Sequence, residues 1–218
     1  MSDRPLPDTQ SSYSAVAEEY AEKFFGELAH KPKDCELLDR FAAMTAGKGR
    51  VCDLGCGPGQ IARYLHERGV EVCGIDLAPG MVEVARRLNP AISFEVGDMR
   101  ALPLANESLA GLAAFYSIIH IPRPDVTEVL GELRRVLQPG GMLLLAFHGG
   151  NEVVHLDEWW GKAVALDFTF FEREEMEGYL RAAGLSIVET IQRDPYVEVE
   201  HPSQRMYIFS TKGTIECH

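Results

Sequence analysis

Residues 51–60 read VCDLGCGPGQ and place three glycines at alternating positions directly behind a short apolar run. The run is typical of a buried strand, and the residues from Ile61 onward are typical of a helix that ends at Gly69. Glycine permits a positive φ and a close approach of the backbone, so such a loop can lie against a ligand and present N–H groups at a helix start. The stretch therefore predicts a strand–loop–helix unit with a ligand at the end of the strand.

The alternation of strand and helix continues along the chain. Further strands are predicted over 70–76, 92–98, 111–118, 141–147, 185–194 and 205–212, and further helices over 12–30, 35–44, 81–89, 124–137 and 172–184. The first strands are short and almost continuously apolar, which is typical of a parallel sheet with helices on both faces. We predict a doubly wound α/β fold.

The length of 218 residues fits one domain. We expect residues 1–11, which are polar and contain several prolines and serines, to be disordered. A single domain is predicted over 12–212, with a helical cap over 12–48. Residues 151–171 are rich in aromatic side chains without a clear period, and we interpret them as an aromatic lid inserted after the fifth strand.

The charge balance excludes some classes of partner. The chain has 21 Lys and Arg against 33 Asp and Glu, a net charge of −12. Binding to nucleic acid depends on clustered basic side chains, so we expect no nucleic-acid partner. Without an apolar span long enough for a membrane helix or the apolar core of a signal peptide, we expect no membrane association and a cytoplasmic location. The oligomeric state stays open.

Acidic residues end three consecutive predicted strands. Asp53 precedes the glycines, Asp76 follows Gly57 by 19 residues, and Asp98 ends the third strand. In a parallel sheet, ligands bind beyond the carboxyl ends of the strands, where an acid at the position of Asp76 accepts the hydroxyls of a ribose. A carboxylate at Asp98 is placed to accept the amino group of an adenine. The pattern predicts a nucleoside site.

The nucleoside can be a nicotinamide dinucleotide or a different adenosine derivative. The dinucleotide motif is G-x-G-x-x-G, whereas the spacing here is G-x-G-x-G. A carboxylate such as Asp53 repels a pyrophosphate but favours a cationic ligand. These features favour S-adenosylmethionine, which carries a ribose, an adenine, a sulfonium and an α-amino group.

The motifs also resemble a known family. VCDLGCGPG, GIDLAPGMVEVAR, VGDMRALPL and LRRVLQPGGMLLLAF follow one another as in the class I S-adenosylmethionine-dependent methyltransferases, specifically the small-molecule branch similar to ubiquinone and menaquinone biosynthesis enzymes. The resemblance covers roughly residues 12–148. It implies a seven-stranded sheet whose last strand is antiparallel.

The resemblance also implies roles for individual residues. The residues expected to contact the methionine part are Asp53, near its amino group, Gly55, Cys56 and Gly57. Those expected around the adenosine are Asp76, Leu77, Met81, Asp98 and Met99, with Tyr116 and Ser117 closing the site after the fourth strand. Tyr13 and Tyr20 are candidates to reach the cofactor carboxylate, although either can equally be a packing aromatic of an amphipathic helix.

Histidines at two strand ends are candidates for a general base. His120 follows the fourth strand and His148 ends the fifth, where side chains face the ligand site; a histidine at a strand end can also simply bind a backbone carbonyl. His155, Trp159 and Trp160 in the predicted lid are candidates to contact the methyl acceptor, and the lid aromatics can instead form a small core of their own. No metal site is expected.

These observations predict transfer of a methyl group to oxygen or nitrogen of a small molecule, with S-adenosylhomocysteine as the product; carbon remains possible. A catalytically silent cofactor-binding regulatory or scaffold protein has the same cofactor motifs and stays an alternative. An NAD-dependent oxidoreductase is a weaker one, because the glycine spacing and Asp53 count against it.

Overall fold

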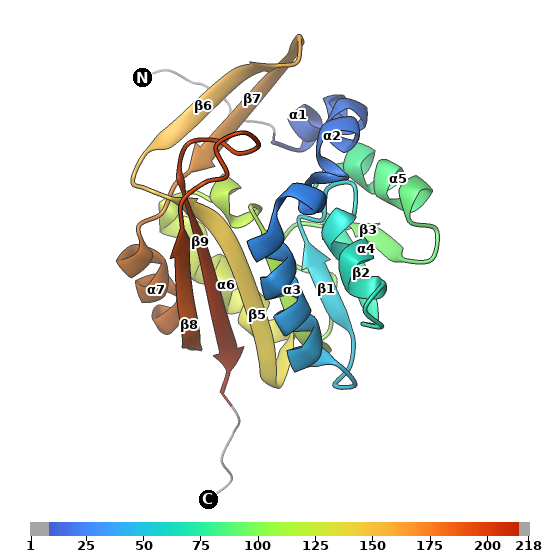
Figure 1. Ribbon diagram of the computed structural model, residues 1–218. Coiled ribbons are helices and arrows are strands. Elements are labelled where there is room, and N and C mark those ends of the chain that lie inside the picture. Colours follow the sequence, from blue (N-terminus) through green and yellow to red (C-terminus); the bar gives the residue numbers. More distant parts are fainter. Residues whose placement is uncertain (1–8, 214–218) are drawn as a thin grey trace, which may run out of the picture.

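The computed structural model describes residues 9–213 and has a central sheet of seven strands in the order β3-β2-β1-β4-β5-β9-β8 (Figure 1). The strands are β1 (Val51–Leu54), β2 (Val72–Asp76), β3 (Ser93–Val96), β4 (Leu109–Phe115), β5 (Leu137–Gly149), β8 (Leu185–Arg193) and β9 (Gln204–Lys212). Pairing from β3 to β5 is parallel, and β9 runs antiparallel to β5 and β8. The doubly wound fold with an antiparallel last strand is confirmed.

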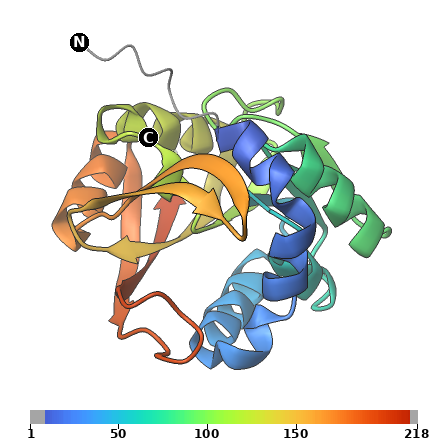
Figure 2. The same ribbon diagram turned by 90° about the horizontal axis from the view of Figure 1, so that it is seen from above.

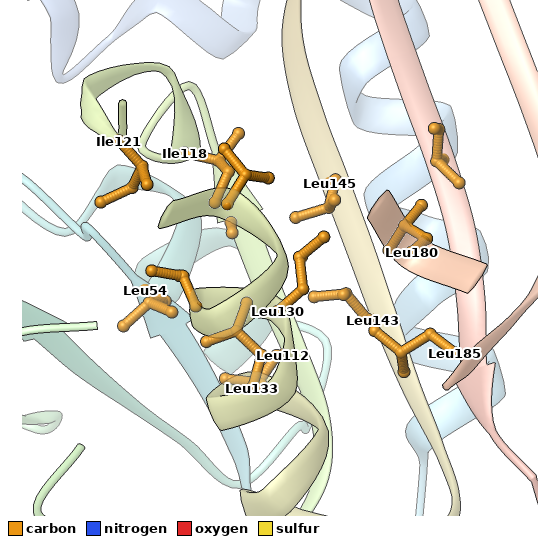
Figure 3. Packing of buried hydrophobic residues seen from close by; sticks show 14 of the residues in the cluster. Leu54, Leu112, Ile118, Ile121, Leu130, Leu133, Leu143, Leu145, Leu180 and Leu185 are labelled. Carbon is orange, nitrogen blue, oxygen red and sulfur yellow. The ribbon is translucent and has the colours of Figure 1, made fainter. Parts of the chain in front are cut away.

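Helices cover both faces of this sheet. One face carries α3 (Pro32–Thr45), α4 (Gln60–His66) and α5 (Pro79–Leu88), and the other carries α6 (Val126–Val136) and α7 (Arg173–Ala182). Figure 3 shows the second face, where Leu130 and Leu133 of α6 lie against Leu112 and Leu143 of the sheet. Burial of one fully apolar side chain contributes about 1.5–3 kcal/mol. The two apolar layers hold the strand ends in place.

The N-terminal segment is a broken helix rather than the continuous one expected over 12–30. It consists of α1 (Thr9–Ala15), α2 (Ala17–Phe24) and the 3₁₀ turn η1 (Glu27–His30). Residues 9–11, expected to be disordered, form the start of α1, while residues 1–8 lie outside the described part of the chain. Tertiary contacts stabilise α1, since the Ser12 hydroxyl accepts a hydrogen bond from the Ala165 N–H at 2.9 Å.

The aromatic insertion forms a β-hairpin. Strand β6 (Val153–Trp159) pairs antiparallel with β7 (Lys162–Thr169), and the two residues between them, Trp160 and Gly161, have φ of 52° and 77°. Two positive φ values are what a tight hairpin turn requires. Seen from above, the hairpin crosses over the sheet end beside α1 (Figure 2).

Short 3₁₀ turns follow β4. They are η2 (Ile118–His120) and η3 (Arg123–Asp125), and they lead into α6. In the part of the chain that the structure describes, none of the helices has both the length and the apolar character to span a bilayer.

Candidate functional site

A cavity of about 620 Å³ opens at the carboxyl ends of the central strands. Its walls come from the loops after β1, β2, β3 and β4, from α1 and from the hairpin. Twelve of the site residues predicted from the sequence line it: Tyr13, Tyr20, Gly55, Gly57, Asp76, Leu77, Met81, Asp98, Met99, Tyr116, Ser117 and His120. Asp53, Cys56, His148, His155, Trp159 and Trp160 lie outside this lining. The strand ends therefore bring most of the predicted site together.

The glycine loop lies tightly against the loop after β4. Gly55 has a φ of 68°, and the Ser117 hydroxyl donates a hydrogen bond to the Leu54 carbonyl at 2.8 Å. Gly59, with a φ of 86°, precedes the first residue of α4. L-residues with side chains rarely adopt such angles, so the glycines allow the chain to turn from strand into helix beside the cavity.

Asp53, expected near the amino group of the cofactor, is buried and does not line the cavity. Its carboxylate is buried and accepts a hydrogen bond from the Ala62 N–H in the first turn of α4 at 2.9 Å. Side chains alternate along a strand, so Asp53 lies on the same side of β1 as Val51, which packs among α3 and α4. Burial raises the pKa of Asp53 to about 8. The residue fixes α4 against β1.

Cys56 also lies behind the loop and does not line the cavity. Its thiol is buried close to Gly74, where an added Cβ would stand 2.9 Å from the sulfur. Burial raises the pKa of this thiol well above its usual value. We therefore interpret Cys56 as a packing residue of the loop.

Asp76 orients the loop and faces the cavity. One carboxylate oxygen accepts the Gly57 N–H and the other accepts the Ala78 N–H, both at 2.8 Å. Burial raises the pKa of Asp76 in spite of these two hydrogen bonds. Each carboxylate oxygen keeps a further lone pair, so the group can still accept ligand hydroxyls.

Asp98 follows the end of β3, beside the end of β2 that carries Asp76, and the Arg100 guanidinium contacts both of its oxygens at 2.5–3.0 Å. This contact outweighs partial burial and lowers the pKa of Asp98. Three apolar side chains belong to the same lining: Leu77, Met81 and Met99. The lining thus combines two carboxyl groups with apolar surface.

Tyr116 has a φ of 52°, which is unusual for a residue other than glycine. The turn is held by a hydrogen bond from its N–H to the Ala146 carbonyl at 2.8 Å. The ring lines the cavity, while Lys31 and Arg205 lie over it at 5.7 and 5.6 Å. Strained backbone that is held in this way is often found at functional sites.

His120 is connected to both α1 and the hairpin. Its Nδ1 lies 2.9 Å from the Asp167 carbonyl oxygen, and its Nε2 lies 2.8 Å from the Tyr13 hydroxyl. A carbonyl only accepts, so Nδ1 carries the proton. Burial lowers the pKa of His120 to about 4. The ring is therefore neutral near pH 7, and the Tyr13 hydroxyl donates to Nε2.

Tyr20 lines the cavity on the side of the glycine loop. A Cβ added at Gly57 would stand 3.8 Å from its ring. Burial raises its pKa far above the usual value, with Glu27 and Asp76 adding to the effect, so the hydroxyl stays protonated. Tyr20 can donate a hydrogen bond to a ligand that rests on the loop.

His148, the second candidate for a general base, does not line the cavity. Strand β5 runs on past it to Gly149, and His148 pairs with Arg205 of β9 inside the sheet. Its ring stacks on Phe170 at 4.8 Å, and Nδ1 lies 2.9 Å from the Ser203 hydroxyl. Burial and the Arg205 charge lower the pKa of His148 to about 3.

The three predicted lid residues also fail to line the cavity. His155 binds Asp157 and Asp167 with its two ring nitrogens, at 2.9 and 2.6 Å. Trp159 and Trp160 stack on each other at 4.6 Å, and both contact the Tyr20 ring. The tryptophans therefore pack the hairpin against α1 and α2. This agrees with the alternative interpretation, in which the lid aromatics form a small core of their own.

Other lining residues were missed by the sequence analysis. Thr9 and Gln10 come from α1, and the hairpin contributes Val153, Asp167 and Thr169. Nothing in the sequence pairs these segments with the sheet. The remaining lining residues follow strand ends and could have been found from their place in the chain: Leu54, Gly97, Arg100, Phe115, Ile121, Pro122, Arg123 and Asp125.

No metal site was expected, and within residues 9–213 no group of three or more His, Cys, Asp or Glu side chains has an arrangement that could hold a metal ion.

Comparison with known proteins agrees with this geometry. Residues 51–141 match the methyltransferase domain family. The part of the chain from β1 to the start of β5 is therefore similar to a methyltransferase domain. This match favours S-adenosylmethionine over the nicotinamide alternative as the cofactor.

The relatives differ in what their names say. The chain is 34% identical over 111 residues to a malonyl-[acyl-carrier protein] O-methyltransferase of Serratia marcescens, covering 51% of this chain and 43% of the relative. It is 33% identical over 97 residues to a demethylmenaquinone methyltransferase of Renibacterium salmoninarum, covering 44% and 40%. The chain thus matches less than half the length of these two relatives.

A solved S-adenosylmethionine-dependent methyltransferase of Methanosarcina mazei has the same fold. The TM-score is 0.69 at 17% identity, and the match covers 76% of this chain and 92% of that one.

Proposed function

We propose that this protein transfers the methyl group of S-adenosylmethionine to a hydroxyl or amine of a small molecule. The observation that carries the proposal is the shared cavity, which is lined by Asp76 and Asp98, candidates to bind the cofactor, and also by neutral His120. A volume of about 620 Å³ suits an adenosine derivative together with a small acceptor.

The residues present fit the cofactor. Gly55 and Gly57 offer a loop without side chains for the methionine part, and the Tyr20 hydroxyl offers a donor to its carboxylate. Asp76 has lone pairs for the ribose hydroxyls, and Asp98 can accept the adenine amino group in place of one of its hydrogen bonds from Arg100. Leu77, Met81 and Met99 supply the apolar contacts of the adenine ring. The bound cofactor would supply a methyl group already activated by a sulfonium.

The charges of the lining favour a neutral or cationic acceptor. Among the described lining residues the arginines are both committed, Arg100 to Asp98 and Arg123 to Glu175 at 2.9 Å. Four aspartates line the same cavity: Asp76, Asp98, Asp125 and Asp167. A carboxylate acceptor would enter without a cation to receive it, whereas a hydroxyl or an amine needs none.

A silent cofactor binder has the same cofactor end, so the acceptor end separates the two functions. A scaffold does not need a neutral imidazole that is partly buried together with its hydrogen-bond partners, because removing polar groups from water costs free energy. The acceptor side of the cavity contains such an arrangement in Tyr13 and His120. This favours an enzyme.

Binding and turnover test the proposal in sequence. Calorimetry should show binding of S-adenosylhomocysteine but not of NAD, and Asp76→Ala should abolish it. Glu71→Ala, which removes an exposed acid just before the same strand, should leave the affinity unchanged. Strong NAD binding would refute the cofactor assignment.

Turnover is then measured with S-adenosylmethionine carrying a radiolabelled methyl group, against phenols, alcohols, amines and carboxylic acids. Label should enter phenols, alcohols or amines. Labelling of carboxylic acids alone would contradict the neutral acceptor, and binding without any turnover would establish the silent binder.

A further inference from the structure

The hydroxyl of Tyr13 is hydrogen-bonded to Nε2 of His120 at the wall of the cavity, and this bond gives the two residues different roles. Both side chains line the cavity, yet each ring nitrogen of His120 already has a partner in the protein. We propose that Tyr13 is the catalytic residue that contacts the acceptor and takes its proton, while His120 receives the proton of Tyr13. The inference rests on the proposed methyl transfer.

The hydrogen-bonding capacity of the two side chains carries the argument. A neutral imidazole with its proton on Nδ1 has one acceptor position, the lone pair of Nε2, and the Tyr13 hydroxyl occupies it. The Tyr13 oxygen donates its single proton to His120 and keeps its lone pairs. A hydroxyl or amine that enters the cavity can therefore donate to Tyr13 but not to His120.

The surrounding structure fixes this pair. Tyr13 belongs to α1, where the flanking Ser12 accepts the Ala165 N–H and Ser14 accepts the Gly80 N–H at 3.3 Å. The first contact holds α1 on the hairpin, and the second holds it on α5. Asp167, which binds His120 through its backbone, belongs to the same hairpin. This proton relay, from the acceptor through Tyr13 to His120, is complete only while α1 and the hairpin are docked.

Methyl transfer is coupled to two proton transfers. The acceptor oxygen or nitrogen forms a bond to the methyl carbon while the carbon–sulfur bond breaks and its electron pair stays on sulfur. The acceptor proton passes to the Tyr13 oxygen, and the Tyr13 proton passes to Nε2 of His120, which gives it to water after product release. One positive charge leaves the sulfur and one appears on the imidazole, so the net charge of the cavity is unchanged.

Burial keeps the His120 ring in the neutral form, which can accept a proton. It lowers the pKa of the ring to about 4, so the base is unprotonated throughout the neutral range. The titratable or charged groups near the pair on the elements around it are Tyr20 of α2, Asp76 of β2, Arg123 and Asp125 of η3, and Asp167 of β7. The Asp167 carboxylate binds His155, and Arg123 binds Glu175.

The first test reads the proton positions without any acceptor. Nitrogen-15 NMR of the His120 ring is recorded at pH 7 with S-adenosylhomocysteine bound. We expect a protonated Nδ1 and a bare Nε2. In Tyr13→Phe the Nδ1 proton should stay, and the Nε2 resonance should move toward that of a nitrogen without a hydrogen bond. A proton on Nε2, or an imidazolium at pH 7, would overturn the relay.

The second test asks whether Tyr13 serves the cofactor instead. By calorimetry, Tyr13→Phe should change the dissociation constant of S-adenosylhomocysteine by less than about threefold. Tyr20→Phe, on the neighbouring helix, is the contrast and should weaken it by about tenfold or more, because a hydrogen bond to a charged group is lost. The reverse order would show that Tyr13 holds the cofactor carboxylate, against the proposal.

The third test uses two acceptors of similar size, 4-nitrophenol and 4-methylphenol. Loss of a general base typically lowers the rate by about 10²–10⁴-fold. Tyr13→Phe should show this loss with 4-methylphenol but a much smaller one with 4-nitrophenol, which ionises readily, and the difference should narrow as the pH rises. Equal losses with both phenols would indicate a structural role.

The outcomes separate the relay from the proposed function. If no phenol, alcohol or amine is methylated while the NMR pattern holds, the transferase proposal fails, and the catalytic role of Tyr13 fails with it. If methylation occurs but the proton positions are reversed, the relay alone fails.

Discussion

Glu200 and Arg193 form a paired ion contact in which each carboxylate oxygen accepts from a different guanidinium nitrogen, at 2.7 and 2.9 Å. Arg193 ends β8, and Glu200 lies in the loop that leads to β9. The same guanidinium binds Asp34 of α3 at 2.9 Å. Arg205, 3.5 Å from the other side of Glu200, lies over the Tyr116 ring. The ion cluster thus contacts the cavity wall through Arg205 and the ring of Tyr116.

Glu200→Gln should destabilise the protein because it leaves buried cations without their partner. Breaking a buried ion pair costs about 3–5 kcal/mol. The positive charges around it lower the pKa of Glu200 to about 2. A depressed folded-state pKa contributes stability that is present above the unfolded value of about 4.3 and is lost as the pH falls toward 2.

Urea unfolding at several pH values checks this prediction. The difference between wild type and Glu200→Gln should be large at pH 7 and should shrink below pH 4. Glu198→Gln, an exposed acid in the same loop, should change neither value. A difference that does not depend on pH would mean that the charge of Glu200 is not what matters.

Asp53→Asn should stabilise the protein above neutral pH. The raised pKa of about 8 means that the folded state holds a proton that the unfolded state has released. This contribution is fully present below the unfolded pKa of about 3.9 and is lost as the pH rises to 8, at up to about 1.4 kcal/mol per pH unit. An asparagine keeps an acceptor for the Ala62 N–H and has no charge to bury.

The comparison is made by unfolding at pH 5 and pH 8. The advantage of Asp53→Asn should appear at pH 8 and be small at pH 5. Asp53→Ala, which removes the acceptor as well, should lose about 1–3 kcal/mol at pH 5. Equal pH profiles of wild type and Asp53→Asn would refute the buried-acid interpretation.

The sequence predicts the position of strand ends well but the direction of side chains less well. Asp76 and Asp98 reach the cavity because the carboxyl ends of parallel strands meet at one edge of the sheet. Asp53 occupies a similar place in the chain but points to the other side, where it meets α4. Because side chains alternate between the two faces of a sheet, a shift of one residue changes the face to which a side chain points. Strand β5 is also longer than its apolar run suggests, so His148 lies within the strand and does not line the cavity.

Contacts between distant segments could not be predicted from the sequence. The hairpin was expected as an irregular aromatic insertion, because its aromatic residues gather at the turn and around the end of β7 and do not alternate along the strands. The pairing of Tyr13 with His120 spans 107 positions and depends on how α1 docks. His120 itself was found because it follows a strand end.

Gly55→Ala should abolish cofactor binding and destabilise the fold. A Cβ there would stand 2.3 Å from the Ser117 Cβ, and the backbone φ is positive. Ser117 has no room to move because its hydroxyl binds the Leu54 carbonyl. Overpacking costs typically about 1–3 kcal/mol, and the backbone strain adds to it.

Gly57→Ala is the matched variant, since its φ is also positive but its Cβ would meet nothing closer than 3.8 Å. Thermal unfolding without ligand should therefore show a smaller loss for Gly57→Ala than for Gly55→Ala. Equal losses would mean that backbone strain alone, rather than the contact with Ser117, requires glycine at position 55.

Trp160→Ala should loosen α1 and α2 without loosening the sheet. Trp160 stacks on Trp159 at 4.6 Å and contacts Phe24 at 6.0 Å and Tyr20 at 6.4 Å, so its removal weakens the contact between the hairpin and the N-terminal helices. Aromatic pairs contribute about 0.5–1.5 kcal/mol each beyond their buried area. Local opening free energies of such peripheral elements lie below the global free energy of unfolding.

Hydrogen exchange measures this effect. The amides of α1 and α2 should exchange about tenfold or more faster in Trp160→Ala, those of β1 and β4 should be unchanged, and Trp160→Phe should lie in between. Uniform acceleration across the sheet would show instead that the hairpin contributes to global stability.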